Sequence, residues 1–184
     1  MRKKRPSNAP VQTFIEAQGE LIEILDEQSR PLMIMPREAA LAQRLPYQVV
    51  LVIVRNREEQ VYIHRRAERK KTYAGLWSVS ASGLVKAGEA VKDAAVRELS
   101  EELGVTGLPI SLVATADPSP ETDWARVNLF VSSPANTIIT PDPKEISAGM
   151  FVDEDELTAL LRDMPEMITP ALKWVSGVTN LFKL

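Results

Sequence analysis

The feature that most constrains this chain is a helix with three acidic residues on the side that faces inward. Residues 90–103 are rich in Ala, Val, Leu and Glu and end at Gly104, which predicts one helix. At 100° per residue, Glu98, Glu101 and Glu102 span an arc of about 100°, and apolar residues of earlier turns share that arc. Like charges gathered there repel one another, and a divalent cation would reverse the sign of that interaction.

Composition limits which metal the chain can hold. The 184 residues include no cysteine and one histidine. This excludes disulfides, thiolate zinc sites, iron–sulfur clusters and a thiol nucleophile. A metal must therefore be held mainly by oxygen, and glutamates suit Mg²⁺ or Mn²⁺. The formal net charge of -3 implies no general attraction of the whole domain to nucleic acid or to an anionic membrane.

The amino-terminal segment differs from the rest in charge. Residues 1–18 are expected to form a basic flexible tail, and residues 19–184 a single domain. No apolar stretch follows the basic cluster, so it is not a secretory signal, and a cytoplasmic location is expected. The tail is interpreted either as a solubilising segment or as an arm that binds nucleic acid. The longest apolar run, residues 49–54, is too short to span a bilayer.

The rest of the chain alternates between short strands and helices. Strands are predicted at residues 21–25, 32–35, 47–54, 60–64, 77–81, 110–114, 127–131 and ending at 151–152. Helices are predicted at residues 36–43, 90–103, 153–161 and 170–178. The first two strands suggest a hairpin, and residues 60–64 are expected to pair back onto residues 47–54. This mixture predicts an α+β or α/β sandwich.

The loop before the central helix completes a longer pattern. Its members are Gly83, Glu89, the run Arg97-Glu98-Leu99, the pair Glu101-Glu102 and the ending Gly104-Val105. Together they resemble the complete Nudix box, the signature of the Nudix hydrolase superfamily. The resemblance implies an α/β/α sandwich with a mixed sheet, to which this chain adds an N-terminal β-hairpin. The resemblance also allows a homodimer, although no feature of the sequence indicates one.

The resemblance implies roles for individual residues. Glu98, Glu101 and Glu102 would ligate one or more Mg²⁺ ions, or Mn²⁺, and Arg97 would orient a box glutamate by ion pairing. The general base varies in position within the superfamily. A box glutamate, Glu101 or Glu102, is one candidate, and Glu145, shortly before a late strand, is another. The alternative interpretation of Glu145 is an ordinary surface carboxylate.

Candidate substrate contacts lie before the box and at its first residue. Arg65 and Arg66 could bind phosphate, or they could be solvated charges of a strand edge, and alternation puts them on opposite faces. The backbone at Gly83 could approach a phosphate closely. Trp77 is interpreted as a core residue rather than a base-stacking one. The loop at residues 117–124 could close over the site.

A second resemblance narrows the subgroup. Residues 23–37 look like the amino-terminal part of hydrolases related to isopentenyl diphosphate isomerase. That isomerase depends on a cysteine and on histidines that bind metal. Alignment on Trp77 puts Ser82 at the position of the cysteine and Leu84 at the position of a histidine. The isomerase reaction in its known form is therefore excluded, and the intact box favours hydrolysis.

The sequence as a whole predicts a Mg²⁺-dependent pyrophosphohydrolase. Its substrate is expected to be a small molecule, a nucleoside diphosphate derivative or a related small diphosphate, with no membrane and no nucleic acid as partner. Two alternatives stay open. One is a non-catalytic Nudix domain that binds a nucleotide as a sensor. The other is a protein that interacts with nucleic acid through its basic tail.

Overall fold

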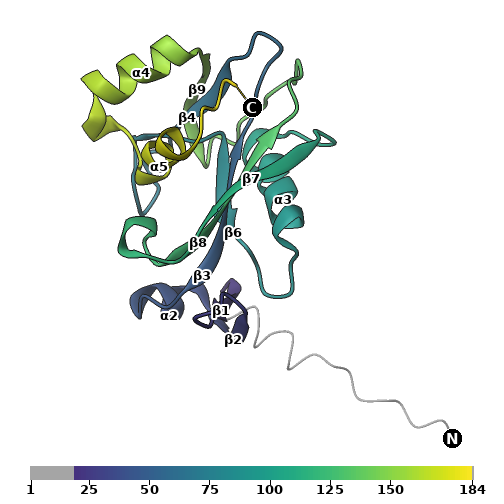
Figure 1. The fold of residues 1–184 in the computed structure, drawn as a ribbon, viewed down its shortest axis with the longest axis vertical. Coiled ribbons are helices and arrows are strands. Elements are labelled where there is room, and N and C mark those ends of the chain that lie inside the picture. The colour runs from purple at the N-terminus through teal and green to yellow at the C-terminus, as the bar shows by residue number, and fades with distance from the viewer. Residues whose placement is uncertain (1–18, 184) are drawn as a thin grey trace, which may run out of the picture.

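The fold is built from three groups of strands with helices on both sides (Figure 1). The structure is a computed structural model that describes residues 19–183, so the expected basic tail lies outside the described residues. The larger sheet has the order β6 (Ala81–Leu84), β3 (Tyr47–Ile53), β8 (Ala125–Ser132) and β7 (Ile110–Ala116). A second sheet has the order β5 (Trp77–Ser78), β4 (Val61–Arg66) and β9 (Ile146–Val152). The hairpin consists of β1 (Leu21–Leu25) and β2 (Pro31–Pro36).

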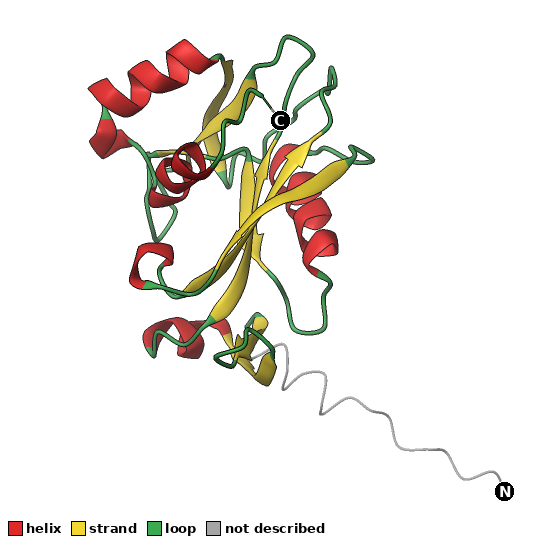
Figure 2. Cartoon of the chain, in the orientation of Figure 1, coloured by secondary structure: helices red, strands yellow, loops and turns green. Residues whose placement is uncertain are grey.

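Strand β3 explains why the molecule has three layers. It pairs antiparallel with β6 and parallel with β8, so the larger sheet is mixed. Its apolar side chains alternate between two cores, as the period of a strand requires. Val50 and Val52 pack toward α3 (Val91–Leu103), whereas Leu51 and Ile53 pack in the core that holds residues of α4 (Glu154–Asp163) and α5 (Pro170–Val178). The expected α/β/α sandwich is confirmed, with helices on either side of the strands in Figure 2.

The amino-terminal hairpin adds a small core at one end of the sandwich. The register of β1 and β2 is antiparallel, as expected for a hairpin. Ile22 and Ile24 from β1 and Ala40 from α2 (Arg37–Ala42) are buried with Tyr47 and Ala125, which begin β3 and β8. The hairpin and α2 are thereby fixed against the end of the larger sheet where these two strands start.

Two expected strand features differ from the structure. Residues 60–64 were expected to pair with residues 47–54, but β4 joins the second sheet and keeps only a short bridge between Arg55 and Val61. The segment expected as one strand at 77–81 is divided into β5 and β6, which belong to different sheets. Ser80 lies at this crossing point. Its hydroxyl accepts a bond from the Val54 amide (2.7 Å) and donates one to the Tyr62 carbonyl (2.5 Å).

Helix ends follow ordinary capping chemistry. Gly104, with φ of 65°, ends α3 in the left-handed conformation that glycine adopts without strain. Asp153 caps α4 by accepting from the Glu156 amide at 2.8 Å. The fold also contains two short 3₁₀ helices, at Pro120–Thr122 and Pro165–Met167. Within residues 19–183, none of the helices has the length and apolar character needed to cross a membrane.

Candidate active site

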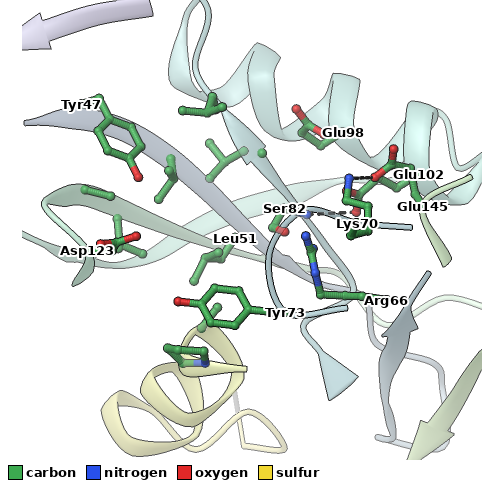
Figure 3. A pocket seen from close by; sticks show the side chains of 18 of the residues that line it. Tyr47, Leu51, Arg66, Lys70, Tyr73, Ser82, Glu98, Glu102, Asp123 and Glu145 are labelled. Carbon is green, nitrogen blue, oxygen red and sulfur yellow. Dashed lines mark hydrogen bonds and ion pairs between the residues drawn. The ribbon is translucent and has the colours of Figure 1, made fainter. Parts of the chain in front are cut away.

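One cavity of about 700 Å³ brings most of the candidate residues together (Figure 3). Its wall is formed by α3, by β6, β3 and β8 of the larger sheet, by the end of β4, by α2 and α5, and by loops between these elements. Glu98, Glu102 and Glu145 gather on one side of the cavity in Figure 3, whereas Tyr47 and Asp123 lie on the opposite side. The cavity therefore has an acidic end and an aromatic end.

Arg97 organises the acidic end from within the box. Its Nε donates to Glu89 at 2.8 Å, and its Nη1 contacts Glu98 at 2.5 Å and Glu101 at 3.1 Å. Its Nη2 donates to the Leu84 carbonyl at 2.9 Å, which fixes the guanidinium against β6. One cation, with 19% of its side chain exposed, thus contacts three carboxylates, and its orienting role in the reaction stays a prediction.

Glu98 and Glu102 are buried although they are acidic. Burial raises the pKa of Glu98 to about 7, against the opposing effect of Arg97. Burial and the charge of Glu98 raise the pKa of Glu102 to about 8. The Glu102 carboxylate accepts a bond from the Ser82 amide at 3.2 Å. Glu101 differs from both, because its side chain is 55% exposed at the rim. Two of the three box glutamates therefore sit where an ionised carboxylate is costly unless a cation is near.

Gly83 makes room for one of these carboxylates. A Cβ atom at residue 83 would lie 1.9 Å from Oε1 of Glu98, far inside any contact distance. The residue lines the cavity, as the sequence predicted. Only glycine allows Glu98 to approach β6 this closely.

Glu145 reaches the cavity through a loop that is docked on the end of α3. The Asp142 amide donates to the Glu102 carbonyl at 2.9 Å, and the Glu145 amide donates to the Asp142 carbonyl at 2.9 Å. The Glu145 carboxylate lines the cavity and forms an ion pair with Lys70. The loop thus carries a fourth carboxylate to the acidic end, beside the end of the helix that supplies the others.

The structure separates the two candidate arginines. Arg66 lines the cavity, and its Nε donates to the Thr72 carbonyl at 3.2 Å. Arg65 points elsewhere, with its Nε bonded to the Gly75 carbonyl at 2.7 Å and its Nη2 3.3 Å from Glu68. Alternation along β4 puts successive side chains on opposite faces, so only Arg66 is brought to the cavity.

The comparisons with known proteins agree with this geometry. A family profile described as the NUDIX domain matches residues 45–175. The chain belongs to the Nudix family. This Nudix domain is 32% identical to an uncharacterized Nudix hydrolase of Streptomyces coelicolor over 152 residues, which cover 80% of this chain and 82% of the relative. It is 34% identical over 121 residues to isopentenyl-diphosphate Delta-isomerase of Cereibacter sphaeroides, covering 62% of this chain and 68% of that protein.

Solved structures show the same fold. A protein of Deinococcus radiodurans superposes with a TM-score of 0.77 at 23% identity, covering 88% of this chain and 100% of that one. The NUDIX domain of NrtR from Shewanella oneidensis, solved with ADP ribose, gives 0.56 at 15% identity, with 77% and 96% covered. Nudix hydrolases act on small-molecule diphosphates with the help of divalent metal ions. This Nudix domain is accordingly a hydrolase of phosphorus-containing anhydrides, with relatives among isomerase-like members.

The acidic end of the Nudix domain suits a cation that keeps part of its water shell. Within residues 19–183, no three acidic or histidine side chains are close enough to one another to hold a metal ion by themselves. Mg²⁺ is commonly bound by one or two carboxylates together with water and phosphate oxygens, not by an all-protein cage. Buried Glu98 and Glu102, on the wall of one open cavity, are donors of that kind. The residues present therefore fit a divalent metal ion that is bound in part by water or phosphate oxygens.

The sequence did not predict the aromatic end of the cavity. Tyr47, Tyr73 and Trp174 line the cavity but come from a strand, a loop and α5. None of them belongs to a motif, and only the packing of distant elements brings them together. Trp77, the tryptophan considered in the sequence, packs instead against the core next to α4 and α5. Asp123, from the loop expected to close over the site, lines the same end.

Proposed function

We propose that this Nudix domain is a Mg²⁺-dependent pyrophosphohydrolase that cleaves the diphosphate linkage of a nucleoside diphosphate derivative or a related small diphosphate. The observation that carries the proposal is the division of one cavity into an acidic end, with buried carboxylates on α3, and an aromatic end. A diphosphate with an organic group is a ligand whose two parts match these two ends.

The acidic end supplies the groups for the reaction. Glu98 and Glu102, with Glu101 at the rim, would hold the metal together with water and phosphate oxygens, and the bound metal would neutralise charge on the diphosphate and favour attack by water. Arg97 keeps Glu98 and Glu101 in place through its ion pairs. A carboxylate oxygen of Glu145 accepts the proton of the attacking water, because Glu145 lines the cavity and is not engaged by Arg97.

Cationic and backbone groups bind the phosphates. Arg66 lines the cavity with its guanidinium, a group suited to phosphate oxygens. The short backbone segment at Gly83 borders the same space and can approach the diphosphate, as glycine carries no side chain. Arg65 takes no part, since its guanidinium is bonded to the neighbouring loop.

The aromatic end binds the organic group. Tyr73 and Trp174 offer aromatic surfaces that can stack on a planar ring, and Tyr47, which is mostly buried, borders the same space. The carboxylate of Asp123 can accept hydrogen bonds from a base or a sugar. The ADP ribose bound by the NrtR domain is a nucleoside diphosphate derivative, which supports this class of substrate for the same fold.

A substrate panel tests the proposal. Release of phosphate or nucleotide is measured with Mg²⁺ and with a chelator, on nucleotide sugars, dinucleotides, nucleoside triphosphates and isopentenyl diphosphate. We expect Mg²⁺-dependent turnover of at least one nucleoside diphosphate derivative. Glu102→Gln, which removes a charged ligand but keeps the shape, is expected to lower kcat by about 100-fold or more. Tight binding without turnover of any compound would instead identify a nucleotide sensor.

A further inference from the structure

One cation in the cavity has no role in the mechanism described above. Lys70 lies in the loop between β4 and β5, lines the cavity and forms an ion pair with Glu145. Both side chains are largely shielded, with 27% of Lys70 and 33% of Glu145 exposed. In Figure 3 the amine of Lys70 points into the space beside Glu102. The pair therefore belongs to the interior of the cavity and not to the outer surface.

The ion pair is not needed to hold the two loops together. The Ala67 amide donates to the Glu145 carbonyl at 2.9 Å, and Nε of Arg69 donates to the Lys144 carbonyl at 2.9 Å. The lysine loop is thus joined to the backbone of the Glu145 loop by two other bonds, one from a backbone amide and one from the side chain of Arg69. What the ion pair adds is a fixed position for the side chain of Glu145.

The carboxylates around the ion pair of Lys70 and Glu145 indicate what the lysine does. Glu98 and Glu102 lie on α3 at the same end of the cavity as Glu145, so their ionised forms repel one another. Arg97 is occupied by its own partners within the box. Lys70 balances the carboxylate that the loop at the end of α3 brings beside Glu102, and loss of this cation would leave Glu145 without its ion pair next to two other carboxylates.

We propose that Lys70 is a positioning residue of the reaction, which holds the Glu145 carboxylate in the cavity so that it faces the attacking water. This inference rests on the proposed function of Glu145 as the base. Lys70 acts through Glu145 and does not bind the scissile group, so its removal lowers the rate of the chemical step and leaves substrate affinity nearly unchanged.

Lysine substitutions at neighbouring positions provide the test. Lys70→Gln removes the charge, Lys70→Met keeps the aliphatic stem, and Lys70→Arg restores a cation. Lys71→Gln is the matched control, because Lys71 is in the same loop but its side chain is 90% exposed and forms an ion pair with Glu38. We expect kcat to fall about 10-fold or more in both neutral Lys70 variants with KM within about 3-fold, and to be largely restored in Lys70→Arg. Lys71→Gln should match the wild type.

A double variant separates positioning from other roles. If Lys70 acts through Glu145, then Lys70→Gln causes little further loss in a Glu145→Gln background. Additive losses would overturn the inference, as would a rise in KM at constant kcat, which marks direct binding of substrate. Equal kcat in Lys70→Gln and Lys71→Gln, with an active wild type, contradicts only the role of Lys70. A wild type inactive on the whole substrate panel contradicts the proposed function and this inference with it.

Discussion

At residue 83 the carboxylate of Glu98 occupies the space that a side chain would fill. We therefore expect Gly83→Ala to displace Glu98 from β6 and to lower kcat by about 10-fold or more, with the fold retained. Gly177→Ala in α5 is the control, because a Cβ atom there meets nothing within 4 Å. Steady-state kinetics and thermal melting of both variants check this. Wild-type kinetics in Gly83→Ala would show that the position of Glu98 has no influence on turnover.

At the same scale, some residues of the site could be predicted from the sequence and others could not. The spacing of Arg97 and the box glutamates predicts their places on one helix, and Arg97 pairs there with Glu98 and Glu101. The expected cluster of three glutamates is not formed, because no three acidic side chains within residues 19–183 lie close enough to hold a metal ion by themselves, so metal binding by this set stays a prediction. Arg65 and Arg66 could not be told apart by type, because only their order along β4 decides which one reaches the cavity. Lys70 and the aromatic end could not be predicted, since their position depends on how distant loops and helices pack.

At the scale of the elements, packing between distant segments again limits prediction. Ser80 lies where the sequence did not show which sheet each strand joins. The strand propensities of residues 60–64 and 77–81 are correct, but propensity does not reveal which sheet a strand joins. The switch of sheets leaves the Val54 amide and the Tyr62 carbonyl without strand partners, and the buried Ser80 hydroxyl bonds to both. A side chain, and not the ladder, thus completes the hydrogen bonding where the two sheets separate.

Ser80→Ala should destabilise the protein because it leaves two buried backbone groups without a partner. We expect the free energy of unfolding to fall by roughly 1–3 kcal/mol. Ser100→Ala, on the exposed side of α3, should change it by less than about 0.5 kcal/mol. Urea denaturation of the two variants provides the measurement. Equal stabilities would mean that water or a local shift satisfies the freed groups.

For the whole molecule, the buried glutamates predict how stability depends on pH. The folded pKa values of Glu98 and Glu102, about 7 and about 8, lie above the value of 4.5 for an unperturbed glutamate. Between these limits the folded protein binds more protons than the unfolded chain, so the free energy of unfolding falls as pH rises. In the metal-free protein we expect a loss of several kcal/mol, on the order of 5, between about pH 5 and about pH 8.

Denaturation at several pH values, with and without Mg²⁺, measures this effect. The variant Glu98→Gln/Glu102→Gln should lose most of the slope, because it has no carboxyl group to ionise at either position. Mg²⁺ should stabilise the wild type most at the alkaline end, where its ligands are ionised, and should have little effect on the variant. Parallel pH profiles of wild type and variant would show that these two groups do not govern the stability.

The parallel pairing of β3 with β8 has a consequence for a chain that is still being made on the ribosome. The whole signature, from Gly83 to Val105, is synthesised before β8. Strand β3 therefore cannot form its parallel pairing until the chain after α3 has been made. Glu145 and the strand β9, which pairs with β4, arrive later still. A nascent chain that already carries the entire signature therefore has no working centre. Catalytic competence comes late in synthesis, when the last strand joins its sheet.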